Sequence, residues 1–129
     1  KYYNDDLKNR TLTILGVSFK PNTDDIRDSS SLIIAKELLK KGAKIKVNDP
    51  KAMENAKKEI EQLLTFNNVY EACQQSEGLI IATEWNEYRA LDLLRIKSLL
   101  IEPVIFDLRN IYNPQEVLIA GIKYFGIGR

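Results

Sequence analysis

The fold of this chain is decided by residues 11–42, which read TLTILGVSFKPNTDDIRDSSSLIIAKELLKKG. The apolar run Thr11–Val17 predicts a strand, and the apolar residues at helical spacing in Leu32–Lys41 predict a helix. The serines at 29–31 offer hydroxyl N-caps, and Gly42 after two lysines is typical of a helix end. The sequence therefore predicts a strand–loop–helix unit, which is the first part of a βαβ crossover.

The same alternation continues along the rest of the chain. Further strands are predicted at Ala43–Asn48, Thr65–Phe66, Gly78–Thr83, Pro103–Asp107 and Lys123–Ile127. Further helices are predicted at Pro50–Leu64, Val69–Gln75, Leu91–Leu100 and Pro114–Ala120. Because strands that alternate with helices form parallel crossovers, we predict an α/β, Rossmann-like domain of three layers. Its sheet should be mostly parallel, with about five to six strands and helices on both faces.

Length and charge limit the domain organisation and the partners. We assign residues 11–129 to one domain and interpret the polar residues 1–10 as a linker from a missing upstream region. The formal net charge of +1 gives no electrostatic reason to expect nucleic acid as a partner. No apolar run reaches the roughly 18–20 residues that span a bilayer, so we expect no membrane partner. A single cysteine fits the reducing cytoplasm, where we place the protein.

The chain offers few side chains for catalysis. It has no histidine, the residue that most readily titrates near neutral pH. Cys73 lies in the predicted helix VYEACQQ, beside Ala72, and is interpreted as a small packing residue. We therefore assign no catalytic residue and no metal site to this chain.

Candidate binding residues follow the predicted strands. Parallel α/β sheets bind ligands beyond the carboxyl ends of their strands, which here are Phe19–Ser30, Thr83–Trp85 and Asp107–Asn110. A dinucleotide fingerprint needs several glycines close to a pyrophosphate, and Gly16 alone does not supply them. We therefore do not expect this sheet to hold NAD in the usual Rossmann manner.

Cationic side chains at this edge are the alternative to glycine. Lys20 and Arg27 suit phosphate as a point charge and a planar fork of donors, unless Arg27 pairs with the aspartates beside it. Arg109 follows a buried strand and either meets a ligand or forms a salt bridge with Asp107. The pair Glu84-Trp85 is either part of a site or a tryptophan that covers the sheet edge.

Six motifs carry a family resemblance, and they read GVSFKPNTDDIRDSSS, NDPKAMENAK, YEAC, ATEW, DLRNIYNP and YFGIGR. Together they resemble the C-terminal, UDP-binding domain of the UDP-glucose/GDP-mannose dehydrogenase family, from Leu7 to Arg129. The segments FKPNTDDIR and TEW look most like the branch of UDP-glucose 6-dehydrogenases. In these enzymes an N-terminal Rossmann domain binds NAD, and a central helical region carries the dimer contact.

The resemblance implies a function for the whole enzyme. This chain would be the UDP-sugar-binding domain of an NAD-dependent UDP-glucose 6-dehydrogenase, which converts UDP-glucose to UDP-glucuronate in two hydride transfers. NAD would be bound mainly by the missing N-terminal domain, so the isolated chain is expected to be inactive. The full-length enzyme is expected to be a cytoplasmic homo-oligomer that serves polysaccharide biosynthesis.

The resemblance also implies roles for single residues. Phe19, Lys20 and Arg109 match positions that contact the UDP-sugar, and Arg27 matches an arginine that reaches toward NAD. One departure is Leu108, where the family usually has glycine, and a leucine there narrows the backbone options beside Arg109. Two alternatives stay open: a dehydrogenase for another UDP-sugar, and a freestanding nucleotide-binding module without catalysis.

Overall fold

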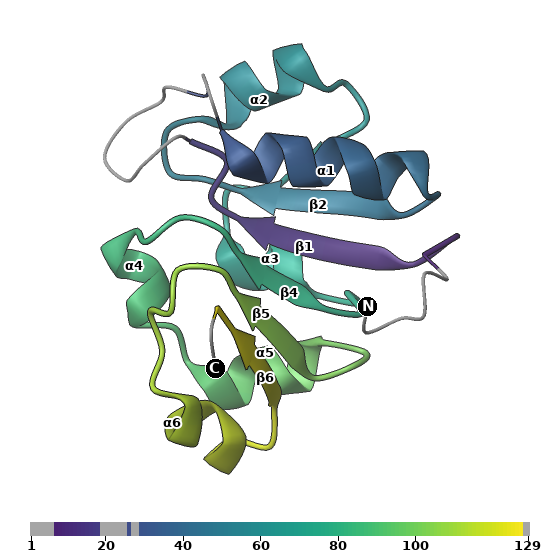
Figure 1. Ribbon diagram of the computed structural model, residues 1–129. Helices are drawn as coiled ribbons and strands as arrows, with labels where there is room; N and C mark the ends of the chain where they lie inside the picture. Colours follow the sequence, from purple (N-terminus) through teal and green to yellow (C-terminus); the bar gives the residue numbers. More distant parts are fainter. Residues whose placement is uncertain (1–6, 19–25, 27–28, 128–129) are drawn as a thin grey trace.

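Six strands form one parallel sheet in the computed structural model, which describes residues 7–18, 26 and 29–127. The strands are β1 (Thr11–Leu15), β2 (Lys44–Asn48), β3 (Leu64–Thr65), β4 (Leu79–Ile81), β5 (Val104–Asp107) and β6 (Lys123–Gly126). Their order is β3-β2-β1-β4-β5-β6, and every neighbouring pair is parallel (Figure 1). This is a doubly wound, Rossmann-like sheet, so the predicted fold class is confirmed.

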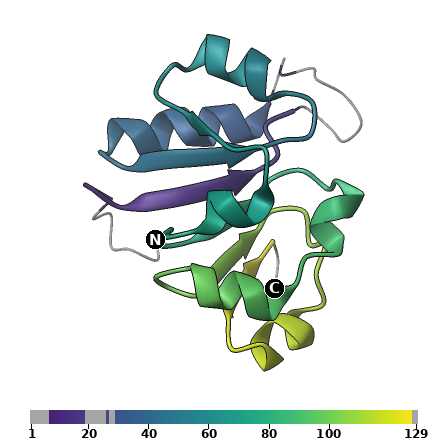
Figure 2. The same cartoon turned by 180° about the vertical axis from the view of Figure 1, so that it is seen from behind.

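Helices lie on both faces of this sheet, as predicted (Figure 1, Figure 2). On one face, α1 (Ser30–Lys40) and α2 (Met53–Glu59) cover the half of the sheet built from β1 and β2. On the other face lie α3 (Val69–Cys73) and α5 (Leu93–Leu99). The short α4 (Asn86–Arg89) follows β4, and α6 (Pro114–Ile119) precedes β6.

Each face of the sheet builds its own hydrophobic core, because successive strand residues point to opposite faces. Leu12 and Ile14 of β1 pack on the side of α1, whereas Leu15 packs on the side of α3 and α5. In β4, Ile80 joins the first of these cores and its two neighbours join the second. The continuous apolar run that predicted a strand buried on both faces is explained by this arrangement.

The charged helix predicted for Pro50–Leu64 is shorter than expected, since α2 spans only Met53–Glu59. Ile60 has extended backbone angles, φ −133° and ψ 100°, and its side chain is buried in the core beneath α1. Leu63 is buried in the same core. The helix ends because these two side chains must reach the sheet, a requirement that the local sequence does not reveal.

Other boundaries differ by a few residues. The first helix begins at Ser30 rather than Leu32, because the Ser29 hydroxyl accepts the Leu32 N–H as an N-cap. The short strand β3 lies at Leu64–Thr65, one residue earlier than predicted. The sequence analysis missed α4.

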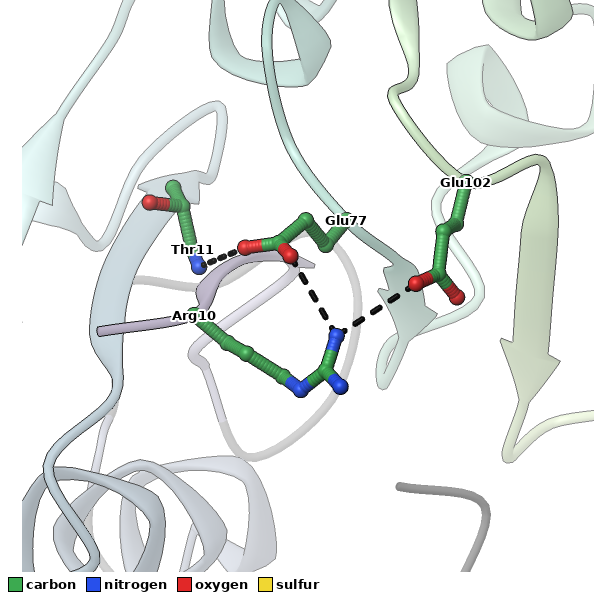
Figure 3. Close-up of polar contacts among 4 residues, drawn as sticks. All are labelled: Arg10, Thr11, Glu77 and Glu102. Atoms are coloured by element: carbon green, nitrogen blue, oxygen red, sulfur yellow. Dashed lines mark hydrogen bonds and ion pairs between the residues drawn. The ribbon is translucent and has the colours of Figure 1, made fainter. Parts of the chain in front are cut away.

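Residues just before β1 contact the domain at the amino edge of the sheet (Figure 3). Leu7 is buried, and the guanidinium of Arg10 lies 3.3 Å from the carboxylates of both Glu77 and Glu102. Glu77 also accepts the backbone N–H of Thr11 at 2.9 Å. Arg10 thereby connects the starts of three central strands, although the predicted boundary between a linker and the domain at residue 10 stays a prediction.

The centre of the sheet depends on a close approach between Gly16 and Thr83. The order of the strands in the sheet reverses between β1 and β4. Gly16 comes just after β1, and Thr83 comes just after β4. Gly16 has φ +94°, and a Cβ added there would overlap the Cβ and Oγ1 of Thr83. The glycine therefore allows the Thr83 side chain to lie against the backbone that leaves β1.

We predict that Gly16→Ala destabilises the domain more than Gly121→Ala does. Both glycines have positive φ, but the added methyl at Gly121 meets only the mobile end of Lys97, whereas Thr83 is buried. The strain of a positive φ is common to both changes, so the difference isolates the clash, which should cost at least about 2 kcal/mol. Urea unfolding monitored by Trp85 fluorescence measures both, and equal losses would contradict this account.

Candidate functional site

The carboxyl ends of β1, β2, β4 and β5 meet on the left side of Figure 1, where α4 also lies. Four described segments gather there: residues 16–18, 48–49, 82–85 and 107–112. Backbone and side-chain hydrogen bonds connect these segments to one another. This edge contains the switch in strand order, which is the expected ligand position in an open α/β sheet.

Arg109 extends from the end of β5 across the end of β4. Its Nε donates a hydrogen bond of 3.0 Å to the carbonyl oxygen of Ala82. Its Nη1 lies 3.9 Å from Oε1 of Glu84, and the Arg109 side chain is 35% exposed. The guanidinium is therefore anchored by one nitrogen, and its other nitrogens lie at the edge near the strand-order switch.

Asp107 holds the backbone that carries Arg109. This carboxylate is fully buried, and its Oδ1 accepts the N–H of Arg109 at 3.2 Å. Its Oδ2 accepts the N–H of Tyr112 at 3.0 Å and the hydroxyl of Tyr124 at 2.8 Å. The alternative that Arg109 forms a salt bridge with Asp107 is not what the structure shows, since the ion pair of the guanidinium is with Glu84.

The turn after β5 accommodates Leu108 without strain at that residue. The positive φ of this turn, +53°, lies at Asn110, a residue type that tolerates the left-handed region. Leu108 donates its N–H to Ile81 and packs against the core beneath α1. The amide of Asn110 also exchanges two hydrogen bonds of 2.9 Å with the backbone of Ile127. The loop that presents Arg109 is therefore fixed at both ends.

Asp49 plays a similar part beside β1, and the sequence analysis did not single it out. Its buried carboxylate accepts the N–H groups of Val17 at 2.8 Å and Ser18 at 3.2 Å through Oδ2. Its Oδ1 accepts the N–H groups of Lys51 and Ala52. The first N–H groups after β1, which cradle a phosphate in glycine-rich loops, are here satisfied by the protein itself.

Two buried tyrosines support the same edge. The Tyr88 hydroxyl lies 2.9 Å from the carbonyl oxygen of Asn48, and the Tyr112 hydroxyl donates to the carbonyl oxygen of Tyr88. Burial raises the pKa of both phenols well above the usual range, and the neighbouring Asp49 and Asp107 add to the shift. Both hydroxyls therefore remain protonated donors at neutral pH.

Cys73 is a packing residue, as predicted. Its side chain is fully buried in the core on the side of α3 and α5. Burial raises the pKa of its thiol to about 12, and the nearby Lys46 only partly opposes this. At neutral pH the group is a neutral thiol without access to a substrate.

The remaining candidate residues divide into two groups. Phe19, Lys20 and Arg27 lie outside the described residues, so their predicted roles stay predictions. Trp85 is buried in the core beside Tyr88, which supports its interpretation as a cover for the sheet edge. Its neighbour Glu84 does contact the candidate site, through Arg109.

The described part of the chain contains neither a group of metal ligands nor a helix that could span a membrane. Within residues 7–18, 26 and 29–127, no three acidic, histidine or cysteine side chains are grouped so as to hold a metal ion. None of the helices found in these ranges has the length and apolar character needed to cross a membrane.

Comparison with known proteins gives consistent matches. Residues 13–114 match the model described as "UDP-glucose/GDP-mannose dehydrogenase family, UDP binding domain". The chain is 46% identical over 124 residues to a UDP-glucose 6-dehydrogenase of Rhizobium meliloti, covering 96% of this chain and 28% of that protein. It is 41% identical over 126 residues to the Rickettsia bellii enzyme of the same name, covering 96% of this chain and 29% of that protein.

A solved structure with the same fold is a UDP-glucose dehydrogenase from Pyrobaculum islandicum. It superimposes with a TM-score of 0.80 at 33% identity, covering 98% of this chain and 27% of that one. The chain thus spans less than a third of the length of these relatives.

We predict that Asp49→Asn destabilises the domain by about 2–4 kcal/mol. An asparagine keeps one acceptor oxygen but turns its NH₂ group toward backbone donors that were satisfied by a charged oxygen. Asp92→Asn is the matched control, because Asp92 is an exposed N-cap of α5, where asparagine is equally suitable. Urea unfolding should show a large loss only for Asp49→Asn, and a similar small change in both would count against the proposed role of Asp49.

Proposed function

This chain belongs to the UDP-glucose/GDP-mannose dehydrogenase family, and from that premise we propose that it binds the UDP part of a nucleotide-sugar substrate. The complete enzyme, in this proposal, is an NAD-dependent UDP-glucose 6-dehydrogenase that oxidises UDP-glucose to UDP-glucuronate in two hydride transfers. The identities of 46% and 41% to enzymes of that name favour UDP-glucose over other nucleotide sugars.

The observation that carries the proposal is the placement of Arg109. Its Nε is held by the carbonyl oxygen of Ala82, so that the guanidinium lies over the end of β4 beside the strand-order switch. A guanidinium fixed in this way offers its terminal nitrogens to a phosphate as a planar, charged pair of donors. The N–H groups of Val17 and Ser18 are occupied by Asp49, so these two backbone groups are not the donors for an anion, and the Arg109 side chain is a candidate donor among the described residues.

Three further residues complete the proposed site. We assign Phe19 and Lys20 to the UDP-sugar together with Arg109, as a ring surface and a second cation respectively. We assign Arg27 to NAD, which the rest of the enzyme would bind. Arg27→Ala in the complete enzyme should then raise the KM for NAD.

The rest of the enzyme supplies the chemistry in this proposal. Since the chain spans 28% of its Rhizobium relative, the NAD domain and the reacting groups would belong to the remaining length. The isolated chain would bind the substrate and orient it without turning it over. We place the full-length enzyme, as a homo-oligomer, in the cytoplasm, where its product would feed polysaccharide biosynthesis.

A dehydrogenase for another UDP-sugar is the second candidate. The structure of a UDP-D-ManNAc dehydrogenase from Pyrococcus horikoshii also matches this chain, with a TM-score of 0.78, but at 22% identity this likeness shows the fold alone. Substrate profiling of the complete enzyme separates these cases. A freestanding nucleotide-binding module is the third candidate function. Sequencing the gene upstream of the codon for Lys1 tests it, because a dehydrogenase would encode a G-x-G-x-x-G unit and a catalytic cysteine there, whereas a freestanding module would not.

We predict that Arg109→Gln weakens UDP binding by about 1.5–3 kcal/mol, which is roughly ten- to a hundredfold in Kd. The change removes the charged guanidinium that would hydrogen-bond the phosphates and leaves a shorter, neutral polar side chain. Isothermal titration of this chain with UDP measures the effect. Lys44→Gln is the control, because Lys44 is exposed at the amino end of β2 and carries the same charge. Equal affinities in the two variants would contradict the assignment of Arg109.

A further inference from the structure

We propose that Glu84 is a built-in counter-ion of Arg109, which competes with the diphosphate of the ligand and lowers the affinity of the site for it. This inference rests on the proposed function, since it concerns the same arginine. It adds a residue that sets how tightly the site holds its ligand. The motif TEW that contains Glu84 was otherwise explained only by the packing of Trp85.

Glu84 lies between two arginines at the carboxyl edge. Its Oε1 is 3.9 Å from Nη1 of Arg109, and its Oε2 is 3.9 Å from Nη2 of Arg89 on α4. The Glu84 side chain is 42% exposed, so an incoming anion can reach the space around it. The Glu84 carboxylate is thus shared by two arginines. One of them, Arg109, is the proposed hydrogen-bond donor to the phosphates of the ligand.

The contact of Arg109 with Ala82 differs in kind from its contact with Glu84. The distance of 3.0 Å from Nε to Ala82 is that of a hydrogen bond, whereas 3.9 Å to Glu84 lies beyond the usual hydrogen-bond range. Within the described part of the chain, the guanidinium is therefore oriented by Ala82, and Glu84 contributes charge rather than orientation. Removing the charge of Glu84 should leave Arg109 in place.

A bound diphosphate would meet this carboxylate as a like charge. Phosphate oxygens that hydrogen-bond the terminal nitrogens of Arg109 would lie within a few ångströms of Glu84, because Glu84 is 3.9 Å from one of those nitrogens. An attraction between partly exposed charges is weak, so a ligand with two phosphates can displace the carboxylate. The repulsion that remains lowers the affinity, and it grows with the charge of the ligand.

The test compares Glu84→Gln with Glu87→Gln by isothermal titration at low salt, with uridine, UMP and UDP as ligands. Glu87 lies three residues away on α4 and is exposed, so its variant carries the same change of net charge. We expect Glu84→Gln to lower the Kd for UDP about fivefold relative to Glu87→Gln. The effect should be smaller for UMP and absent for uridine. Urea unfolding confirms that both variants remain folded.

The outcomes separate this inference from the proposed function. If wild-type chain binds UDP but Glu84→Gln binds it equally or more weakly than Glu87→Gln, the counter-ion role is overturned and the function stands. If wild-type chain does not bind UDP, the proposed function fails, and inorganic pyrophosphate is then titrated into the same proteins. Tighter pyrophosphate binding by Glu84→Gln supports the counter-ion role. Equal binding, or none, overturns it.

Discussion

The carboxylate of Asp49 is the interaction on which the carboxyl edge of this sheet depends. It accepts four backbone N–H groups, two that follow β1 and two that precede α2. A single buried charge thereby fixes the ends of two neighbouring strands and the start of the next helix. Burying an anion is costly unless its hydrogen bonds are satisfied, and here every one of them comes from backbone. The first residues after β1, Val17 and Ser18, are consequently held by a carboxylate of the protein itself.

A second buried carboxylate, Asp107, repeats this solution at the end of β5, where it accepts the N–H groups of Arg109 and Tyr112 and the hydroxyl of Tyr124. The two acids explain how a sheet of Rossmann type can dispense with a glycine-rich loop. Asp49 and Asp107 accept backbone N–H groups at this edge, and Arg109 keeps terminal guanidinium nitrogens that are not bonded to Ala82. Gly16 contributes by letting the Thr83 side chain approach the backbone at the centre of this edge.

Much of the fold could be predicted, because its signals are local. Apolar runs such as LII in β4 and the serine caps before α1 indicate strands and helices directly. The predicted end of the second helix was wrong because it depends on contacts distant in sequence. Helix α2 ends where the Ile60 side chain must reach the core. At the site, the sequence placed Arg109 correctly at the strand-end edge. The sequence analysis offered Asp107 as the ion-pair partner of Arg109, but in the structure Asp107 accepts the backbone N–H of Arg109, and the ion pair is with Glu84, which is far from Arg109 in sequence.

The central position of β1 has a consequence for the order in which the fold is completed during synthesis. One edge of β1 pairs with β2, but its other edge pairs with β4, which ends 33 residues after β2, as the positions of Ile81 and Asn48 show. At ribosomal rates that interval lasts about 2–7 s. Throughout this interval, the side of β1 that later pairs with β4 has no strand beside it. While residues 49–78 are being synthesised, β1 therefore exposes a row of unpaired N–H and C=O groups, which are a template for pairing with another chain.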